Sequence, residues 1–147
     1  MIVDKETLLS DKQAITTTAV STNTIDLGTA RDLGPGDNDL ELYIGVNTAL
    51  TGGTSVQFSY ITSANADLSS AQTIVSTPAI VAADLIAGSE WLRIQLPAIS
   101  KSTQVLRYIG VAYTVVGTFG AGTVSAGVVM DRQAQVYYAS GLNTGGF

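Results

Sequence analysis

VLRYIGVAYTVVGTFGAGTVSAGVVM, residues 105–130, is the stretch that decides how this chain of 147 residues folds. Residues 108–130 carry no charge, and glycines at Gly117, Gly120 and Gly122 punctuate the centre. Apolar residues recur with a period of two on both sides of these glycines, which is the pattern of β-strands. The stretch therefore predicts two long core strands joined by a tight connection.

The first of these two strands is largely apolar on both of its faces. One face carries Val105, Ile109, Val111, Tyr113 and Val115, with Arg107 interrupting it near its start, and the other carries Leu106, Tyr108, Ala112 and Val116. Strands that are covered on both sides have this composition, whereas half-exposed strands alternate apolar with polar residues. We therefore expect both faces of this strand to be covered.

A membrane-spanning helix is the alternative for the same stretch, because about twenty apolar residues cross a bilayer. Its five glycines oppose that interpretation, since each costs about 1 kcal/mol in a helix interior relative to alanine. These are Gly110, Gly117, Gly120, Gly122 and Gly127. Only single arginines, Arg107 and Arg132, flank the run, and no basic cluster marks a cytoplasmic side. We therefore expect no association with a membrane.

Composition excludes several classes of function. A chain of this length forms one domain by default. It has no Cys and no His, which excludes disulfides, thiolate catalysis, Cys/His zinc sites and imidazole acid–base chemistry. The net charge of −5 and the scattered basic residues argue against nucleic-acid binding. Charged residues make up 13%, about half the usual share. A surface with so few charges is typical of a protein whose surface is covered by other subunits. It is equally typical of a β-protein with neutral loops.

The ends of the chain differ from its middle. Residues 1–12, MIVDKETLLSDK, are predicted to form an N-terminal arm, because charges interrupt the apolar residues and no export signal follows. Residues 13–139 are predicted to form a β-sandwich domain, and residues 140–147 a Gly/Asn-rich tail that ends in Phe147.

Short strands and turn signals alternate through the predicted domain. Besides the central pair, strands are expected at 13–21, 24–27, 40–46, 55–62, 71–76, 90–96 and 134–139. A hairpin is expected from Leu40 to Thr62, and one helical turn at 81–87 closed by Gly88. With no long amphipathic helix and no internal repeat, the sum predicts an all-β fold. It is a jelly roll or two-sheet antiparallel β-sandwich with an extended N-terminal arm, and an immunoglobulin-like sandwich stays open.

No residue pattern indicates a catalytic, cofactor or metal site. Ser125 lies in a glycine-flanked segment but has no histidine to act as its base. Asp37, Asp39 and Glu41, beside Asp32, have the chemistry of a hard-cation site, but they lack the order of an EF-hand and also fit a solvated turn. Aromatic residues suited to a sugar-binding surface, or equally to a core or interface, are Trp91, Tyr43, Tyr137 and Tyr138.

Three segments carry a resemblance to a known family. They are MIVDKETLLSDKQAITTTAVSTNTIDLG, WLRIQLPAIS and LRYIGVAYTVVGTFGAGTVSAGVVMDRQ. Together they resemble the capsid cement (decoration) proteins of tailed bacteriophages, of the type that short-tailed phages carry as a small jelly roll. The resemblance spans nearly the whole chain and implies a structural virion protein without enzymatic activity or cofactors.

The resemblance also implies partners and a place. Cement proteins are made in the host cytoplasm and bind the outside of the phage head, where they hold major capsid subunits together. It implies contacts with the major capsid protein and with further copies of the chain, as a dimer or trimer, but with no nucleic acid. The alternatives are a phage tail or receptor-binding β-sandwich protein and, more remotely, a hydrolase built on two carboxylates.

Apolar residues near the two ends are the expected contact residues for the capsid or for other copies. They are Ile2, Val3, Leu8, Leu9 and Phe147. We expect residues 1–9 and 141–147 to act as contact arms, because cement binding needs area and strand addition at a sheet edge supplies it.

Overall fold

The computed structural model describes residues 4–30, 40–95 and 105–130. These ranges contain ten strands and one short 3-10 turn. The strands are β1 (Leu8–Ala14), β2 (Ala19–Val20), β3 (Ile25–Asp26), β4 (Leu40–Thr51), β5 (Ser55–Ser63), β6 (Gln72–Ser76), β7 (Ile80–Val81), β8 (Glu90–Gln95), β9 (Tyr108–Val116) and β10 (Ala121–Met130), and the turn is η1 (Ala82–Asp84). No helix in the described part is long and apolar enough to cross a membrane.

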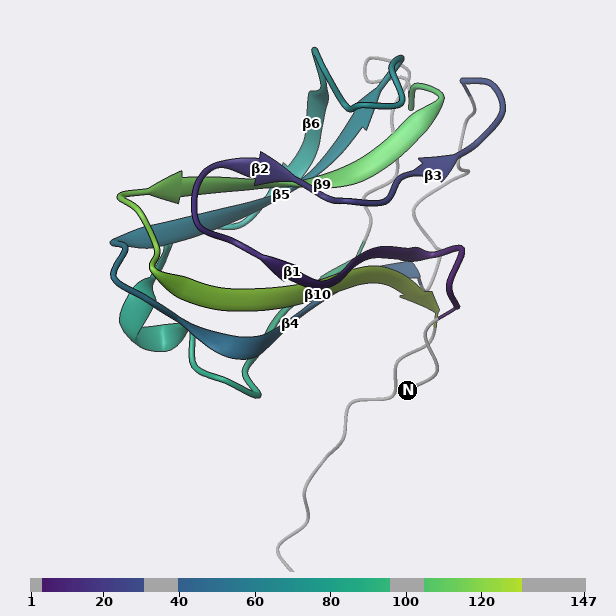
Figure 1. Cartoon of the computed structure of the whole chain (residues 1–147). Helices are drawn as coiled ribbons and strands as arrows, with labels where there is room; N and C mark the ends of the chain where they lie inside the picture. The colour runs from purple at the N-terminus through teal and green to yellow at the C-terminus, as the bar shows by residue number, and fades with distance from the viewer. Residues whose placement is uncertain (1–3, 31–39, 96–104, 131–147) are drawn as a thin grey trace, which may run out of the picture.

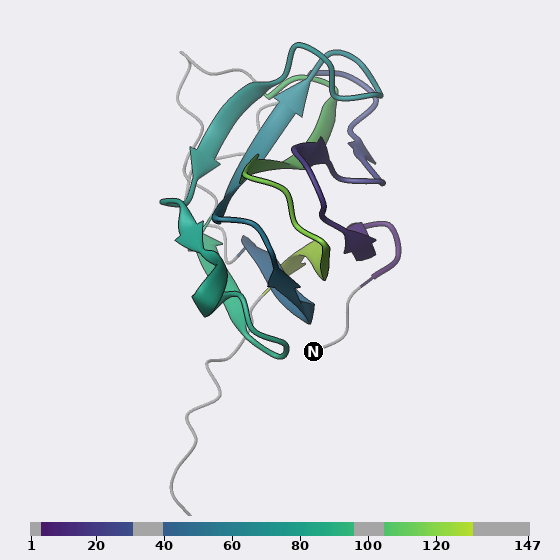
Figure 2. The same cartoon turned by 60° about the vertical axis from the view of Figure 1, so that its left-hand side comes forward.

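The strands form two antiparallel sheets that pack face to face (Figure 1). Sheet A has the order β1-β10-β4-β8, and sheet B has the order β2-β9-β5-β6. Two short strands extend sheet B, since β3 pairs with β9 and β7 pairs with β5. The two layers remain distinct when the molecule is turned (Figure 2). The predicted all-β, two-sheet antiparallel sandwich is confirmed.

Nested pairing explains how the chain reaches this arrangement. β1 pairs with β10, β2 with β9, β4 with β8, and β5 with β6. Early strands thus pair with late ones, as in one long hairpin rolled over into two layers. This is the pairing scheme of a jelly roll.

The core lies between the sheets, on the faces that the period-two pattern predicts. β4 contributes Leu42, Ile44 and Val46, and β5 contributes Val56, Phe58 and Tyr60, all of them buried. From β9, the ring of Tyr113 meets that of Phe58 edge-on, with centroids 5.9 Å apart and an interplanar angle of 90°. Each large side chain buried here contributes about 1.5–3 kcal/mol through the hydrophobic effect.

A polar network also joins the two layers. The Tyr113 hydroxyl from sheet B lies 2.7 Å from Ser10 Oγ in β1, which donates to Gln13 Oε1 at 2.7 Å. Gln13 in turn donates through Nε2 to the carbonyl of Val20 in β2 and accepts from the backbone N–H of Thr22. β1 is therefore fastened to sheet B through side chains as well as to sheet A through its ladder.

The expected hairpin from Leu40 to Thr62 is wrong. β4 lies in sheet A and β5 in sheet B, so the two strands do not pair. β4 continues through the expected turn as far as Thr51, which pairs with Ala121 of β10. Period-two alternation and the glycines Gly52 and Gly53 predict two strands and a short link. They do not show that the link crosses from one layer to the other.

The central stretch contains its two predicted strands, β9 and β10, but they also lie in different sheets. β9 pairs with β5, β2 and β3, whereas β10 pairs with β4 and β1. The connection crosses between the layers and buries Phe119, whose ring lies against Gly53. A Cβ on Gly53 would lie 2.6 Å from that ring, so the crossing needs glycine at this position.

Strand boundaries differ from the expected ones at the N-terminal side. The sheet begins at Leu8 rather than at Gln13, so residues 8–12 belong to the sandwich and not to a separate arm. The expected strand 13–21 is divided, because the chain leaves β1 after Ala14 and enters β2 at Ala19 in the other sheet. The expected helical turn is present as η1, and Gly88 follows it with a φ of 83°. The expected strand 134–139 and tail 140–147 lie outside the described residues.

Candidate functional site

The outer face of sheet B carries small residues and three exposed valines. Across one row, Ser55 of β5 pairs with Val81 of β7 and with Val116 of β9. A parallel row joins Ser76, Ser59, Ala112 and Val20. The exposed fractions are 37% for Val20, 50% for Val81 and 53% for Val116. These seven residues, with Gln57 and Thr114 between the rows, are called the uncharged face below.

Charge is missing from every strand that builds this face. β2, β5, β6, β7 and β9 contain no Asp, Glu, Lys or Arg. Covering a charged group costs several kcal/mol when it is left without a partner, whereas Val, Ser and Thr cost far less to cover. The uncharged face is therefore a surface that another protein can cover at low desolvation cost.

One end of the same outer surface is already covered by the chain itself. The loop after β5 places Leu68, which is 4% exposed, directly on Gly110 of β9. A Cβ on Gly110 would lie 2.3 Å from a Leu68 methyl group. The expected coverage of β9 on both faces is therefore met here. It is not met at the uncharged face, where the described residues leave Val116 open.

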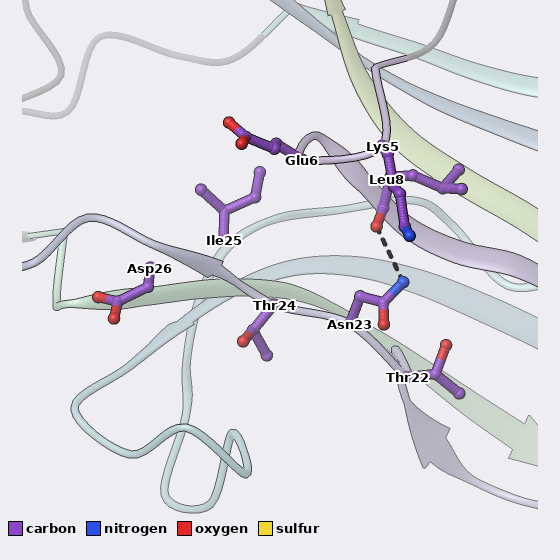
Figure 3. A pocket seen from close by; sticks show the side chains of 8 residues that line it. All are labelled: Lys5, Glu6, Leu8, Thr22, Asn23, Thr24, Ile25 and Asp26. Atoms are coloured by element: carbon purple, nitrogen blue, oxygen red, sulfur yellow. Dashed lines mark hydrogen bonds between the residues drawn. The ribbon is translucent and has the colours of Figure 1, made fainter.

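A polar hollow of about 590 Å³ lies beside β3 (Figure 3). One wall is the segment Lys5, Glu6 and Leu8, and the other wall is the run 22–26. Asn23 joins the two walls by hydrogen bonds. Its Nδ2 donates to the carbonyl of Leu8 at 3.2 Å, and its backbone N–H donates to the carbonyl of Leu9 at 2.9 Å. The side chains combine both charges with neutral groups and do not converge as a nucleophile and base would.

Asp26 lies at the rim of this hollow in an ion pair with Arg107. Arg107 donates through Nε and Nη2 to the two carboxylate oxygens, at 2.8 and 3.0 Å. These hydrogen bonds, with help from the backbone N–H of Gly28, lower the pKa of Asp26 from 3.8 to about 2. Both side chains are about half exposed, so the pair orients the chain at β3 more than it stabilises the fold.

The expected contact residues do not lie together. Leu9 is fully buried in the core, so it packs between the sheets and is not a surface contact. Leu8 is half-buried and lines the hollow beside β3. Ile2, Val3 and Phe147 lie outside the described residues. Leu9 was expected at the surface because the charges around it resemble a free arm, but β1 turns it inward.

Other candidate residues have structural roles or lie outside the described ranges. Ser125 Oγ donates to Asn47 Oδ1 at 2.7 Å and accepts from the backbone N–H of Lys12 at 3.0 Å, so it holds two strands together. Outside the described ranges are Asp32, Asp37, Asp39, Tyr137 and Tyr138. Within them, no group of three or more acidic, His or Cys side chains is placed to hold a metal.

Sequence reasoning missed the uncharged face as a whole. Its residues come from five strands. The signal for it is that every second position of β5 outside the core is uncharged, as Ser55, Gln57 and Ser59 are, with none of the Lys or Glu usual on an outer strand face. The sequence alone does not show that these residues lie beside those of β9, because that requires the register of β5 with β9.

The fold and this surface define a small jelly roll with one uncharged face. The sequence model of the Bbp16 family matches residues 9–128, which is most of the chain. The chain therefore belongs to the Bbp16 family, a family of the phage type. A search of curated proteins finds no match to it.

Proposed function

We propose that the chain is a structural virion protein, a capsid cement subunit. It binds the outside of the phage head through the uncharged face and stabilises contacts between major capsid subunits. The observation that carries the proposal is the set of charge-free strands β2, β5, β6, β7 and β9, whose exposed valines have no cover in the described chain. Membership of a phage-type family supports it.

The size of the face suits part of an interface. On β9 the face runs from Ala112 to Val116, which gives a length of about 17 Å. Across four strands about 4.8 Å apart, the face covers about 300 Å². A standard protein–protein interface buries about 800 Å² on each partner, so the face supplies more than a third of one, and the surface around it supplies the rest.

The proposed role needs area and shape rather than chemistry. It involves no catalysis, cofactor, nucleic acid or membrane, and its partners are the major capsid protein and further copies of the chain, as a dimer or trimer. A net charge of −5 opposes contact between like copies, and a face without charge adds no like-charge contact to that repulsion.

Co-sedimentation of the purified chain with undecorated capsid shells tests the proposal. Val81→Lys combined with Val116→Lys puts two charges on the face at positions that are half exposed. We expect shell binding to fall by at least about tenfold, because both ammonium groups lose water on docking. Ala83→Lys, at an exposed position on η1, is the matched control and keeps binding. Unchanged binding by the double variant, with its melting temperature retained, rules out this face as the contact.

Copy number in purified particles separates the cement role from the tail alternative. Quantitative peptide mass spectrometry measures the chain against the major capsid subunit. We expect a ratio near one-to-one, because a lattice over the shell uses that many copies. A handful of copies per particle contradicts the cement role and favours a tail or receptor-binding protein.

A further inference from the structure

A second hollow lies on the outer face of sheet A. Sheet A is the layer opposite sheet B (Figure 1). Its volume is about 440 Å³, within the range of small-molecule sites. It is lined by Lys12, Tyr43, Gly45, Val46, Asn47, Gly88 and Ser89. Three separate parts of the chain meet there: β1, β4 and the loop between η1 and β8.

The side chain of Tyr43 reaches over Gly45 at this hollow. A Cβ on Gly45 would be 2.3 Å from the Tyr43 hydroxyl oxygen and 2.9 Å from Cζ, so only glycine lets the ring rest there. The side chain stays partly exposed and lines the hollow. An aromatic ring that lines a hollow offers apolar surface and a π-system to a ligand.

Lys12 is brought to the hollow by an irregularity in β1. The register of β1 with β10 shifts between Ser10 and Gln13, and Lys12 within this bulge has a φ of 46°. Its backbone N–H donates to Ser125 Oγ, which donates to Asn47 Oδ1, and these bonds hold the left-handed conformation. Bulges and strained non-glycine residues often redirect a side chain beside a binding site.

Two donor groups are thereby gathered around the ring. Lys12 makes no ion pair with any described residue, although the chain is acidic overall. Asn47 uses its Oδ1 for Ser125, which leaves its Nδ2 without an acceptor among the described residues. An ammonium and an amide N–H are the donors that a carboxylate or sugar hydroxyl accepts from.

From this arrangement we infer that the hollow binds a pyranose sugar, with an acidic one, a uronic acid, preferred. The sugar's C–H groups lie on the ring of Tyr43, and its carboxylate accepts from Lys12 and Asn47. Glu41 lies on the same face of β4, two positions before Tyr43, and does not line the hollow. An aromatic face flanked by neutral polar groups and one cation suits a sugar better than an apolar peptide.

The biological setting of this site rests on the proposed function. When the uncharged face of sheet B lies against the shell, the opposite layer faces the medium. The site then meets the acidic polysaccharides that surround a host cell, and a cement subunit gains a second role in surface attachment.

A titration of the free, ¹⁵N-labelled full chain tests the site itself. The probes are methyl β-D-glucuronide and methyl β-D-glucoside, which differ by a carboxylate. We expect shift changes at Lys12, at residues 43–47 and at residues 88–89, with the glucuronide bound more tightly. Tyr43→Ala reduces affinity by about tenfold or more, whereas Tyr43→Phe keeps the ring and retains most of it. Lys12→Gln removes the preference for the glucuronide.

Two outcomes overturn the inference. One is the absence of shift changes with either sugar, and the other is undiminished binding by folded Tyr43→Ala. The titration uses no capsid, so its result is independent of shell binding. A chain that binds glucuronide but no shell refutes the cement role alone, and a chain that binds shells but no sugar refutes the sugar site alone.

Discussion

The protonation of Asp26 depends mainly on its ion pair with Arg107. The hydrogen bonds from Arg107 lower its pKa to about 2. Because the folded-state pKa is lowered, its contribution to stability is present above pH 3.8 and is lost as the pH falls through about 2. A carboxyl NMR titration of the folded chain should give a midpoint near 2, and Arg107→Gln should move it toward 3.8. An unchanged midpoint in that variant contradicts the assigned cause.

Gly122 shows how a single missing side chain permits a close approach between strands. Its φ is 141°, and a Cβ there would lie 2.5 Å from Cγ and 2.8 Å from Cα of Leu50. We expect Gly122→Ala to lower the free energy of unfolding by about 1–3 kcal/mol through overpacking. Urea unfolding measures the loss.

The matched control for that variant is Gly28→Ala. Gly28 also has a positive φ, 78°, but a Cβ there meets nothing within 4 Å. It should cost only the left-handed penalty of about 1 kcal/mol. Equal losses at the two positions would mean that contact with Leu50 does not limit residue 122.

At the scale of elements, the link between β1 and sheet B is the bond from Tyr113 to Ser10. Ser10 Oγ gives its one proton to Gln13, so the Tyr113 hydroxyl is the donor to Ser10. Burial raises the pKa of this hydroxyl above its ordinary value, which keeps it protonated. Ser10→Ala removes its acceptor and should cost about 1–3 kcal/mol, because a buried hydroxyl is left unsatisfied. Adding Tyr113→Phe should recover part of this loss. Urea unfolding of the two single variants and the double variant measures the coupling, and strictly additive losses contradict it.

The elements themselves were largely predictable from sequence, but their partners were not. Alternation placed β4, β5, β9 and β10 and gave the inward face of β4, β5 and β10, whereas both faces of β9 are apolar. It says nothing of which layer a strand joins, so the links after Thr51 and Val116 were not recognised as crossings. β1 was missed because its charges and its bulge at Lys12 break the period of two.

The candidate surfaces were predictable only in part. The sequence shows that the outer side of β9 is apolar, which predicts that other residues cover it. Within the described chain this cover is present only at Gly110, where Leu68 lies. The hollow of sheet A depends on bringing Lys12 beside residues 43–47 and 88–89. No local pattern encodes that proximity, because it follows from the jelly-roll pairing of β1 with β10.

For the whole molecule, nested pairing should make folding slow. The first strand pairs with the last described one, so long loops must close before the central ladders can form. We expect refolding in milliseconds to seconds, the range of non-local all-β domains. Stopped-flow circular dichroism measures it, and a relaxation in microseconds contradicts the dominance of long-range contacts.

The antiparallel pairing of β1 with β10 also determines how the subunit bears force. Leu8 lies opposite Gly127, and Ala14 lies opposite Thr123, so the outer ends of both strands emerge on the same side. Tension between those ends breaks the hydrogen bonds of the β1–β10 ladder one after another, so only a low force is needed. A pull spread along the strands of sheet B instead shears many bonds of the β5–β9 ladder together. A subunit that is held across sheet B therefore resists force well. A subunit that is pulled at the outer ends of β1 and β10 unfolds at low force.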